Sequence, residues 1–371
     1  VAIVGAKLLL VNDVSLESYL TKVVPSEMPA SFHAEALKAQ AVAARTYAYA
    51  DIYNRSNIKF GYTVDDSIKS QVYNNQNTNN NTTNAVNNTK GMIMTYNNEP
   101  INAFYYSTSS GLTATSNEVW INSRELGEIV PYLIGRNLSK VNGEIVTFDY
   151  QNETSMLAFY KMIKLDTPDN NSPFHRWVTT MNATQLKNTL NANMKISYAA
   201  NPNLVLTKVG DSWVKQAIPN DIGEVLNVGV SKRGSSGVVI ELDIETASGI
   251  YKIVNQYTIR FTIRPMHAGS NVETRRARNT DNTYTSTANN ISILYSGFFA
   301  IEKIADNYSF YGGGNGHGVG MSQYGASGLG NQGKIYREIL ETYYQNIEIK
   351  DITYSYQYNK DAISALIESL D

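Results

Sequence analysis

Residues 34–50, AEALKAQAVAARTYAYA, decide the fold of the first part of this chain. Alanine occupies eight of these seventeen positions, and neither glycine nor proline interrupts them. Alanine has the highest helix propensity, so the stretch predicts a helix, which Ser31 is placed to cap. Because the side chains are small all round, neighbouring elements can approach closely, and we expect this helix to lie buried at the centre of its domain.

A second helix is predicted just upstream, from Leu16 to Val24. Its apolar residues recur at i, i+3, i+4, i+7 and i+8, which indicates one buried face. Asp13 and Ser15 are suitable caps for its start. Proline disfavours the helical conformation of the residue before it, so Pro25 is expected to end this helix near Val24.

Between the two helices lies Glu27, within the segment VPSEMP at residues 24–29. The two prolines restrict the backbone, and Met28 and Phe32 supply apolar surroundings. Partial burial disfavours the charged form of a carboxyl group, and a general acid must carry its proton. Glu27 is therefore a candidate acid, although the spacing alone is more typical of a surface glutamate in a rigid turn between helices.

The rest of the chain is predicted to mix short strands with few helices. Residues 74–88 contain nine asparagines in fifteen positions and predict a surface loop or a partly disordered insert. The expected strands are a pair within 1–12, two more at 91–96 and 101–107, and three at 225–230, 237–246 and 251–260; helices are expected at 183–193 and 334–344.

These elements predict an α+β fold with two lobes and a groove between them. The core catalytic lobe is expected to comprise 1–138 and 263–371, around the alanine-rich helix. The inserted, mainly β lobe is expected at 139–262. This arrangement would bring Glu27 and His317 together, although 290 positions separate them.

Composition narrows the function classes. The formal net charge is −2, with no basic patch or tail, so nothing points to nucleic acid or to an anionic membrane. The absence of cysteine excludes disulfides, thiolate catalysis and cysteine-ligated metals, and gives a modest preference for an exported protein. The first ten residues, VAIVGAKLLL, predict strand rather than a signal peptide. No segment is long enough to span a membrane.

A glycine-rich stretch surrounds His317 at residues 312–326, GGGNGHGVGMSQYGA. Glycine permits positive φ and lets the backbone approach another backbone or a ligand closely. No Gly-Lys-Ser/Thr follows, so it is no phosphate-binding loop, and the second glycine of a nucleophile elbow is missing after Ser322. Val319 and Met321 indicate ordered packing rather than a flexible linker.

A third stretch, FYYSTSSG at 104–111, is followed by Glu118-Val119-Trp120. A strand that runs into a hydroxyl-rich loop and an aromatic residue suits a sugar groove, and equally a capped turn. The four histidines have no metal-ligand spacing, so no zinc site is expected. His33 is interpreted as an exposed residue at a helix start.

Together these segments resemble the SpoIID/LytB family, over about residues 10–350. Residues 13–49 resemble the opening of that family, residues 311–326 its second signature and residues 103–120 a third. PFHRW at 173–177 is similar to a weaker fourth motif. The sporulation members are lytic transglycosylases that act on glycan strands stripped of stem peptides, in concert with an amidase. The LytB-type members are described as modifiers of an amidase.

The resemblance implies a peptidoglycan lytic transglycosylase that cleaves the MurNAc–GlcNAc bond and leaves 1,6-anhydroMurNAc ends. Its role would be in cell-wall remodelling or in engulfment during sporulation. The family's catalytic acid falls on Glu27. One carboxylate suffices because the 6-hydroxyl of the muramic acid attacks intramolecularly, and Glu27 would act first as acid and then as base. The implied partners are peptidoglycan glycan strands and a cell-wall amidase of the sporulation machinery.

The resemblance also bears on the other site residues. Some members carry zinc through a histidine and cysteines around the third motif, where this chain has Tyr106, Ser109 and Ser110, so we expect neither a metal nor a cofactor. Arg45 is interpreted as structural, buried against the central helix. The residues selected for substrate binding are His317, Gln323, Tyr324, Ser322, Tyr106 and Ser107.

Two other functions stay open. A muramidase would hydrolyse the same bond with water and needs a second carboxylate, for which Glu118 and Asp65 are candidates. A non-catalytic glycan-binding protein would instead stimulate an amidase. In every case we expect an extracytoplasmic protein, exported or membrane-anchored, with its N-terminal signal or anchor outside this sequence.

Overall fold

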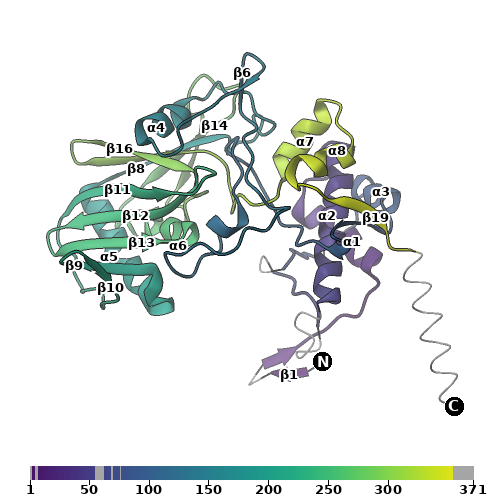
Figure 1. Cartoon of the computed structure of the whole chain (residues 1–371), viewed down its shortest axis with the longest axis horizontal. Helices are drawn as coiled ribbons and strands as arrows, with labels where there is room; N and C mark the ends of the chain where they lie inside the picture. Colours follow the sequence, from purple (N-terminus) through teal and green to yellow (C-terminus); the bar gives the residue numbers. More distant parts are fainter. Residues whose placement is uncertain (1, 5–6, 55–61, 68–69, 76, 354–371) are drawn as a thin grey trace. The chain divides into compact units, whose positions relative to one another are not determined.

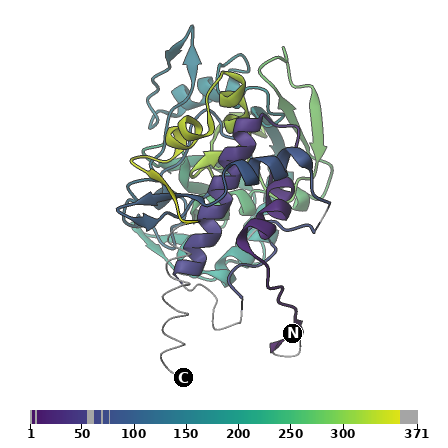
Figure 2. The same cartoon turned by 90° about the vertical axis from the view of Figure 1, so that its right-hand side faces the viewer.

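The alanine-rich stretch forms helix α2 (Ala34–Tyr53) in the computed structural model, which describes residues 2–4, 7–54, 62–67, 70–75 and 77–353. Twelve of its residues are buried, and α1, α3 and α8 pack against it together with strands β3 and β4 (Figures 1 and 2). The predicted central helix is thus confirmed. Its cap is His33 rather than Ser31, because Nδ1 of His33 accepts the N–H of Glu35 at 3.2 Å.

The chain divides into two compact units. The N-terminal unit comprises Val1–Phe104 and Leu329–Asp371, and the central unit comprises Tyr105–Gly328. Residues 105–138 and 263–328, assigned from the sequence to the core lobe, therefore fold with residues 139–262. Strand pairing explains this, because β8 lies between β14 and β17 in one sheet. That a groove separates two lobes stays a prediction.

The N-terminal unit combines helices with a small sheet. An antiparallel sheet of order β19–β3–β4 packs beside the helices, and β1 pairs with β2 as the sequence predicted. The elements besides α2 are α1 (Leu16–Glu27), α3 (Asn80–Asn88), α8 (Tyr336–Tyr343), β1 (Ala2–Val4), β2 (Lys7–Leu9), β3 (Met92–Tyr96), β4 (Glu99–Pro100) and β19 (Glu348–Asp351).

Helix α1 does not end before Pro25, as the sequence analysis expected. It continues through the proline to Glu27, and the N–H of Met28 still donates to the carbonyl of Val24 at 3.0 Å. Proline removes one donor from the helix ladder. Leu20, Val23 and Val24 are fully buried, and this packing offsets the lost bond.

The asparagine-rich stretch is no loop either, because most of it forms helix α3. The side chain of Asn79 caps the helix by accepting the N–H of Asn81 at 2.9 Å. Thr82, Ala85 and Val86 form a buried stripe against α1 and α2. Three small side chains at helical spacing therefore outweigh a polar composition that favours coil.

The central unit is built on two five-stranded antiparallel sheets. One has the order β10–β9–β13–β12–β11 and the other β15–β14–β8–β17–β16. The strands are β8 (Arg176–Asn182), β9 (Val205–Val209), β10 (Ser212–Val214), β11 (Val225–Arg233), β12 (Val239–Thr246), β13 (Gly249–Val254), β14 (Glu273–Ala277), β15 (Ser286–Asn289), β16 (Phe299–Ile304) and β17 (Asn307–Gly312).

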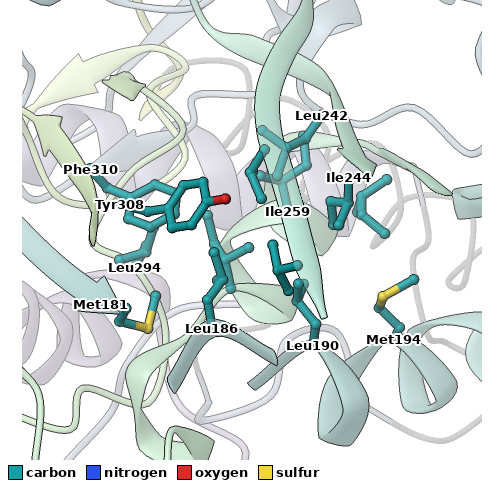
Figure 3. Packing of buried hydrophobic residues seen from close by; sticks show 14 of the residues in the cluster. Met181, Leu186, Leu190, Met194, Leu242, Ile244, Ile259, Leu294, Tyr308 and Phe310 are labelled. Atoms are coloured by element: carbon teal, nitrogen blue, oxygen red, sulfur yellow. The ribbon is translucent and has the colours of Figure 1, made fainter. Parts of the chain in front are cut away.

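A hydrophobic core joins these sheets to helices α5 (Ala183–Ala200) and α6 (Gln256–Thr262). Figure 3 shows Leu186, Leu190 and Met194 of α5 facing Leu242 and Ile244 of β12. Helix α5 begins where the sequence predicted and runs longer, with a capping box between Asn182 and Gln185. Through these contacts, the mainly β segment 139–262 shares one hydrophobic core with strands that lie outside that range.

Two strand predictions are corrected here. Of residues 251–260, only those up to Val254 are strand, and Asn255, with φ 78°, then starts helix α6. Of residues 101–107, only β5 (Tyr105–Tyr106) is strand; it pairs in parallel with β18 (Met321–Ser322), not with β3. The remaining elements are α4 (Glu153–Lys161), α7 (Gln323–Asn331), β6 (Lys140–Val141), β7 (Glu144–Ile145) and short 3-10 turns at Ser116–Glu118, Pro202–Leu204 and Pro265–His267.

The α+β class predicted from the sequence is confirmed by these elements. Within the described ranges, no helix combines the length and the apolar character needed to cross a bilayer.

Candidate functional site

Glu27 is the last residue of α1 and lies in the N-terminal unit. The backbone N–H of Val72 donates to Oε1 of Glu27 at 2.7 Å. Next to it, the hydroxyl of Ser26 donates to the carbonyl of Lys22 at 2.7 Å and accepts the N–H of Asn74 at 3.1 Å. Residues 72–74 thus run along the end of α1 and fix the orientation of the Glu27 carboxylate.

Two tyrosines of the N-terminal unit, Tyr19 of α1 and Tyr47 of α2, are influenced by nearby carboxylates. Burial raises the pKa of the Tyr19 hydroxyl, and the negative charge of Glu27 adds to the rise. The carboxylates of Asp51 and Asp65 also act on Tyr19, and with burial they raise the pKa of Tyr47 to about 12. Both tyrosines therefore stay protonated at neutral pH and can only donate or accept hydrogen bonds there.

Tyr19 ties α1 to the segment that holds Glu27. Its hydroxyl donates to Oε1 of Gln71 at 3.0 Å, and its ring stacks on Tyr73 at 5.7 Å between centroids. Gln71 is fully buried and donates to the carbonyl of Ala44 in α2 at 3.2 Å. These contacts anchor residues 71–73 on both sides of Val72.

Arg45 is structural, as the sequence analysis held. Its guanidinium is fully buried and binds Glu17 through two bonds of 2.8 Å each. It also donates to the carbonyls of Met92 and Val86, both at 3.2 Å. Arg45 therefore joins α1, α2, α3 and β3. Its positive charge is paired with Glu17 inside the N-terminal unit and stabilises the fold there.

Three of the sequence stretches singled out above meet in the central unit. Thr108 and Asn315 exchange backbone hydrogen bonds of 3.0 and 2.8 Å, which joins the hydroxyl-rich loop to the glycine-rich stretch. The N–H of Gly314 donates to the carbonyl of Phe174 at 2.8 Å, and Nε1 of Trp177 donates to the carbonyl of Gly314 at 3.0 Å. The PFHRW segment is thus bonded to the same loop.

Close packing explains why glycine is needed there. A Cβ on Gly312 would collide with the buried ring of Trp177, and one on Gly314 would lie 2.7 Å from the carbonyl oxygen of Thr108. Gly314 also has φ +81°, a conformation that favours glycine. The stretch is therefore an ordered, packed loop, as Val319 and Met321 suggested, and both of those residues are fully buried.

His317 is bonded to backbone groups through both ring nitrogens. Nδ1 accepts the N–H of Val319 at 3.1 Å, which places the ring proton on Nε2, 3.0 Å from the carbonyl oxygen of Tyr105. Burial, the largest cause, and the charge of Arg260 together lower the pKa of His317 to about 4, against the opposing effect of the bond to Tyr105. The imidazole is neutral at pH 7, and these bonds hold the loop against β5.

The hydroxyl of Ser322 also has hydrogen-bond partners inside the central unit. This fully buried hydroxyl donates to Oδ1 of Asp169 and accepts the N–H groups of Ser109 at 3.1 Å and Gly325 at 3.2 Å. Ser109 donates to both carboxylate oxygens of Asp169, at 2.8 Å from its N–H and 2.6 Å from its hydroxyl. Burial raises the pKa of Asp169 to about 6, against the lowering effect of these bonds.

Asp169 is a residue that the sequence analysis missed. It links the hydroxyl-rich loop to the start of α7, and nothing in the spacing around residue 169 marks it out. Since a single carboxylate between hydroxyls shows no periodic pattern, only the folded arrangement reveals it.

The other selected residues lie in the same unit. Tyr106 is 5% exposed, and its ring lies 5.3 Å from that of His317 between centroids. The carbonyl of Ser107 accepts the N–H of Tyr324 at 3.0 Å. Gln323 and Tyr324 begin helix α7, with Gln323 buried and Tyr324 partly exposed. These six residues come together within the central unit, whereas Glu27 belongs to the N-terminal unit.

Glu118 and Asp65, the two candidates for the second carboxylate of a hydrolase, have different surroundings. Glu118 is 2% exposed and accepts the hydroxyls of Ser235, at 2.7 Å, and of Ser236, so it stabilises the turn before β12. Asp65 lies in the N-terminal unit and accepts the N–H and hydroxyl of Ser67 at 2.9 and 2.6 Å, as in a local turn.

The residues at the family's metal positions take part in ordinary contacts. Ser109 bonds to Asp169, and the hydroxyl of Ser110 accepts the N–H of Leu112 at 3.3 Å. Among the described residues, no three His, Cys, Asp or Glu side chains are grouped so that they could hold a metal ion.

Comparison with known proteins adds to this geometry. Residues 4–96 match the SpoIID family model, described as stage II sporulation protein. The chain is 30% identical over 325 residues to an amidase enhancer of Bacillus subtilis, covering 88% of this chain and 39% of that protein. It is 27% identical to stage II sporulation protein D of the same organism and 26% identical to that of Bacillus amyloliquefaciens; both matches cover 92% of this chain and 76% of the relative.

Proposed function

Because this chain belongs to the SpoIID family, we propose that it is a peptidoglycan lytic transglycosylase with Glu27 as its single acid and base. Its substrate would be glycan strands, preferably stripped of stem peptides, and its product 1,6-anhydroMurNAc ends. The observation that carries the proposal is the placement of Glu27 at the end of α1, with one carboxylate oxygen held by the N–H of Val72 at 2.7 Å.

The reaction needs one group that gives and then takes a proton. Protonated Glu27 donates to the glycosidic oxygen while the bond from C1 of MurNAc to that oxygen breaks. The 6-hydroxyl of the same MurNAc then attacks C1, and the Glu27 carboxylate takes its proton, which restores the starting state. Because the nucleophile belongs to the substrate, correct positioning replaces the second carboxylate of a hydrolase.

The contacts of the carboxylate support this role. A group that must act twice benefits from a fixed orientation, and the backbone donor at Val72 supplies it. The hydroxyl of Tyr19 donates to Gln71 and so helps to anchor the segment that carries this backbone donor. Of the residues selected for binding, Gln323 and Tyr324 stay proposals for sugar contacts, whereas His317 and Ser322 have internal partners at the atoms that would bind.

The similarity to an amidase enhancer and to stage II sporulation protein D supports a role at the cell wall. We place the protein outside the cytoplasm, where peptidoglycan lies, and propose a cell-wall amidase as its partner. That partner follows from the similarity to an amidase enhancer.

The test is the incubation of peptide-free glycan strands with the wild-type protein and with Glu27→Gln, followed by mass spectrometry of the products. Glutamine keeps the size of the side chain and an acceptor for the Val72 N–H but cannot transfer a proton. We expect anhydro ends with the wild type and a loss of at least about a hundredfold in rate with the variant, as general acid–base catalysis contributes that much. Reducing ends would indicate hydrolysis, with Asp65 as the next carboxylate to replace.

The second candidate function is a non-catalytic glycan-binding modifier of an amidase, which the similarity to an amidase enhancer favours. On this view Glu27→Gln would stimulate a cell-wall amidase as well as the wild type, and neither protein would release anhydro products. Measuring amidase stimulation in parallel with cleavage therefore separates the two functions.

A further inference from the structure

Trp120 in the central unit projects outward from a buried segment. It is 48% exposed, whereas its neighbours Val119 and Ile121 are 2% and 3% exposed. Of the other two tryptophans, Trp177 is fully buried and Trp213 is partly exposed. Because Val119 and Ile121 are fixed in the interior on either side, the Trp120 side chain has little freedom to turn inward. The fold therefore keeps its ring exposed.

One amide holds the backbone on both sides of Trp120. Nδ2 of Asn255 donates to the carbonyl of Val119 at 2.9 Å and to that of Ile121 at 2.8 Å. Oδ1 of the same side chain accepts the N–H of Tyr257 at 2.7 Å and caps helix α6. Asn255 has φ 78°, a conformation that is rarely populated by residues other than glycine. Such a conformation persists where the surrounding contacts require it.

The ring of Trp120 is also supported from the side. Its centroid lies 5.4 Å from that of His317, with the two planes at 46°. His317 cannot swing away, because Tyr105 and Val319 hold its two nitrogens. The neutral imidazole adds no charge beside the indole. The tryptophan is therefore fixed at its backbone by Asn255 and at its ring by His317.

We infer that Trp120 is the platform on which a sugar ring of the glycan strand stacks, with Asn255 as the residue that positions it. This rests on the proposed function, from which it takes the substrate class. The apolar C–H face of a pyranose packs against an indole, and a ring that is ordered before binding loses little conformational entropy. A rigid aromatic surface offers the flat apolar contact that the face of a sugar ring needs.

The experiment measures binding separately from cleavage. Peptide-free glycan strands are titrated into the full chain carrying Glu27→Gln, which prevents turnover; isothermal titration calorimetry measures the affinity of every variant, and tryptophan fluorescence is followed in parallel. We expect Trp120→Ala to weaken binding about tenfold, Trp120→Tyr to restore part of it, and Trp213→Phe to bind normally. The emission change should vanish with Trp120→Phe and persist with Trp213→Phe.

Asn255→Asp tests the positioning role. Aspartate keeps the acceptor that caps α6 but lacks the N–H groups that hold Val119 and Ile121. We expect it to weaken glycan binding several-fold with an unchanged far-ultraviolet circular dichroism spectrum.

The outcomes distinguish this inference from the proposed function. If Trp120→Ala binds glycan as tightly as the parent chain, the platform is wrong, whether or not Glu27 cleaves. If it binds glycan normally and loses amidase stimulation, Trp120 contacts a protein instead, which also overturns the inference. If binding depends on Trp120 but the wild type releases no anhydro products, the platform stands and the transglycosylase proposal fails.

Discussion

At the scale of single residues, His317 shows how a histidine in a conspicuous motif can serve the fold. Its place in the glycine-rich family signature made it a candidate for substrate binding. In the structure its two nitrogens bond to backbone groups of Tyr105 and Val319, and its ring packs between Tyr106 and Trp120. Its contribution to a site is therefore indirect, through the loop and the indole that it supports.

The pKa of His317 leads to a prediction about pH. Burial and the charge of Arg260 lower this pKa to about 4 in the folded protein, whereas the ordinary value is 6.5. Between these values the unfolded chain binds the proton and the folded chain does not, so the free energy of unfolding falls as the pH drops from 6.5 towards 4. The full effect is about 3 kcal/mol, since each pKa unit corresponds to about 1.4 kcal/mol.

Urea unfolding at pH 7 and pH 4.5 measures this, with His317→Gln as the comparison, because glutamine does not titrate. The loss of stability on acidification should be smaller in the variant. Nitrogen-15 NMR of the imidazole should show the Nε2–H form down to about pH 5. A midpoint near pH 6.5 for protonation of the imidazole would contradict the lowered pKa of His317 and the two backbone hydrogen bonds that hold the ring.

At the scale of elements, the end of α1 and the segment around Val72 act together. Pro25 was expected to end the helix, yet burial of Leu20, Val23 and Val24 keeps it intact up to Glu27. The segment at 71–74, far along the chain, then supplies a backbone donor to the carboxylate. No local pattern predicts such a partner, because a backbone N–H looks the same at every position of a sequence.

The donor at Val72 can be removed without changing Glu27. Val72→Pro lacks the N–H, whereas Val72→Ala keeps it and trims the side chain. A hydrogen bond to a charged group contributes about 1.5–3 kcal/mol, so we expect glycan cleavage to slow by roughly ten- to a hundredfold in the proline variant. Initial rates of anhydro-product release measure this.

Val72→Ala is the matched control and should cleave within about twofold of the wild type, since a half-buried side chain here contributes little. Circular dichroism must show that both variants are folded. A folded Val72→Pro variant with the wild-type rate would show that this hydrogen bond does not orient the acid.

At the scale of the whole molecule, the central unit has a core of its own. The hydrophobic cluster that Figure 3 shows in part runs from Trp177 to Phe310 and draws on β8, α5, β12, α6 and β17. Strand β8 is paired on one side with β14 and on the other with β17. The segment 139–262, expected from its pattern of short strands to form a separate lobe, contains β8 but neither of these partners.

This leads to a prediction about fragments. A fragment of residues 105–331, which includes all of α7, should fold alone and unfold cooperatively on heating, because its core and its sheets are complete. A fragment of residues 139–262 should not, because β8 would expose both edges to solvent. Near-ultraviolet circular dichroism and resistance to protease compare the two. Cooperative folding of the shorter fragment would support the boundaries expected from the sequence.

The sequence by itself determined the elements whose signals are local: the buried alanine-rich helix α2, the start of α1 at the Ser15 cap, the start of α5, and the motifs that placed the chain in its family. Propensity, capping and helical spacing act over a few residues and can be seen in one stretch of chain. Only the tertiary structure decided the passage of α1 through Pro25, the folding of the asparagine-rich stretch as α3, the pairing of β8, and the partners of Glu27, Asp169 and Trp120. Each of these depends on contacts between segments far apart in the chain, whose burial and hydrogen bonds outweigh the local preference.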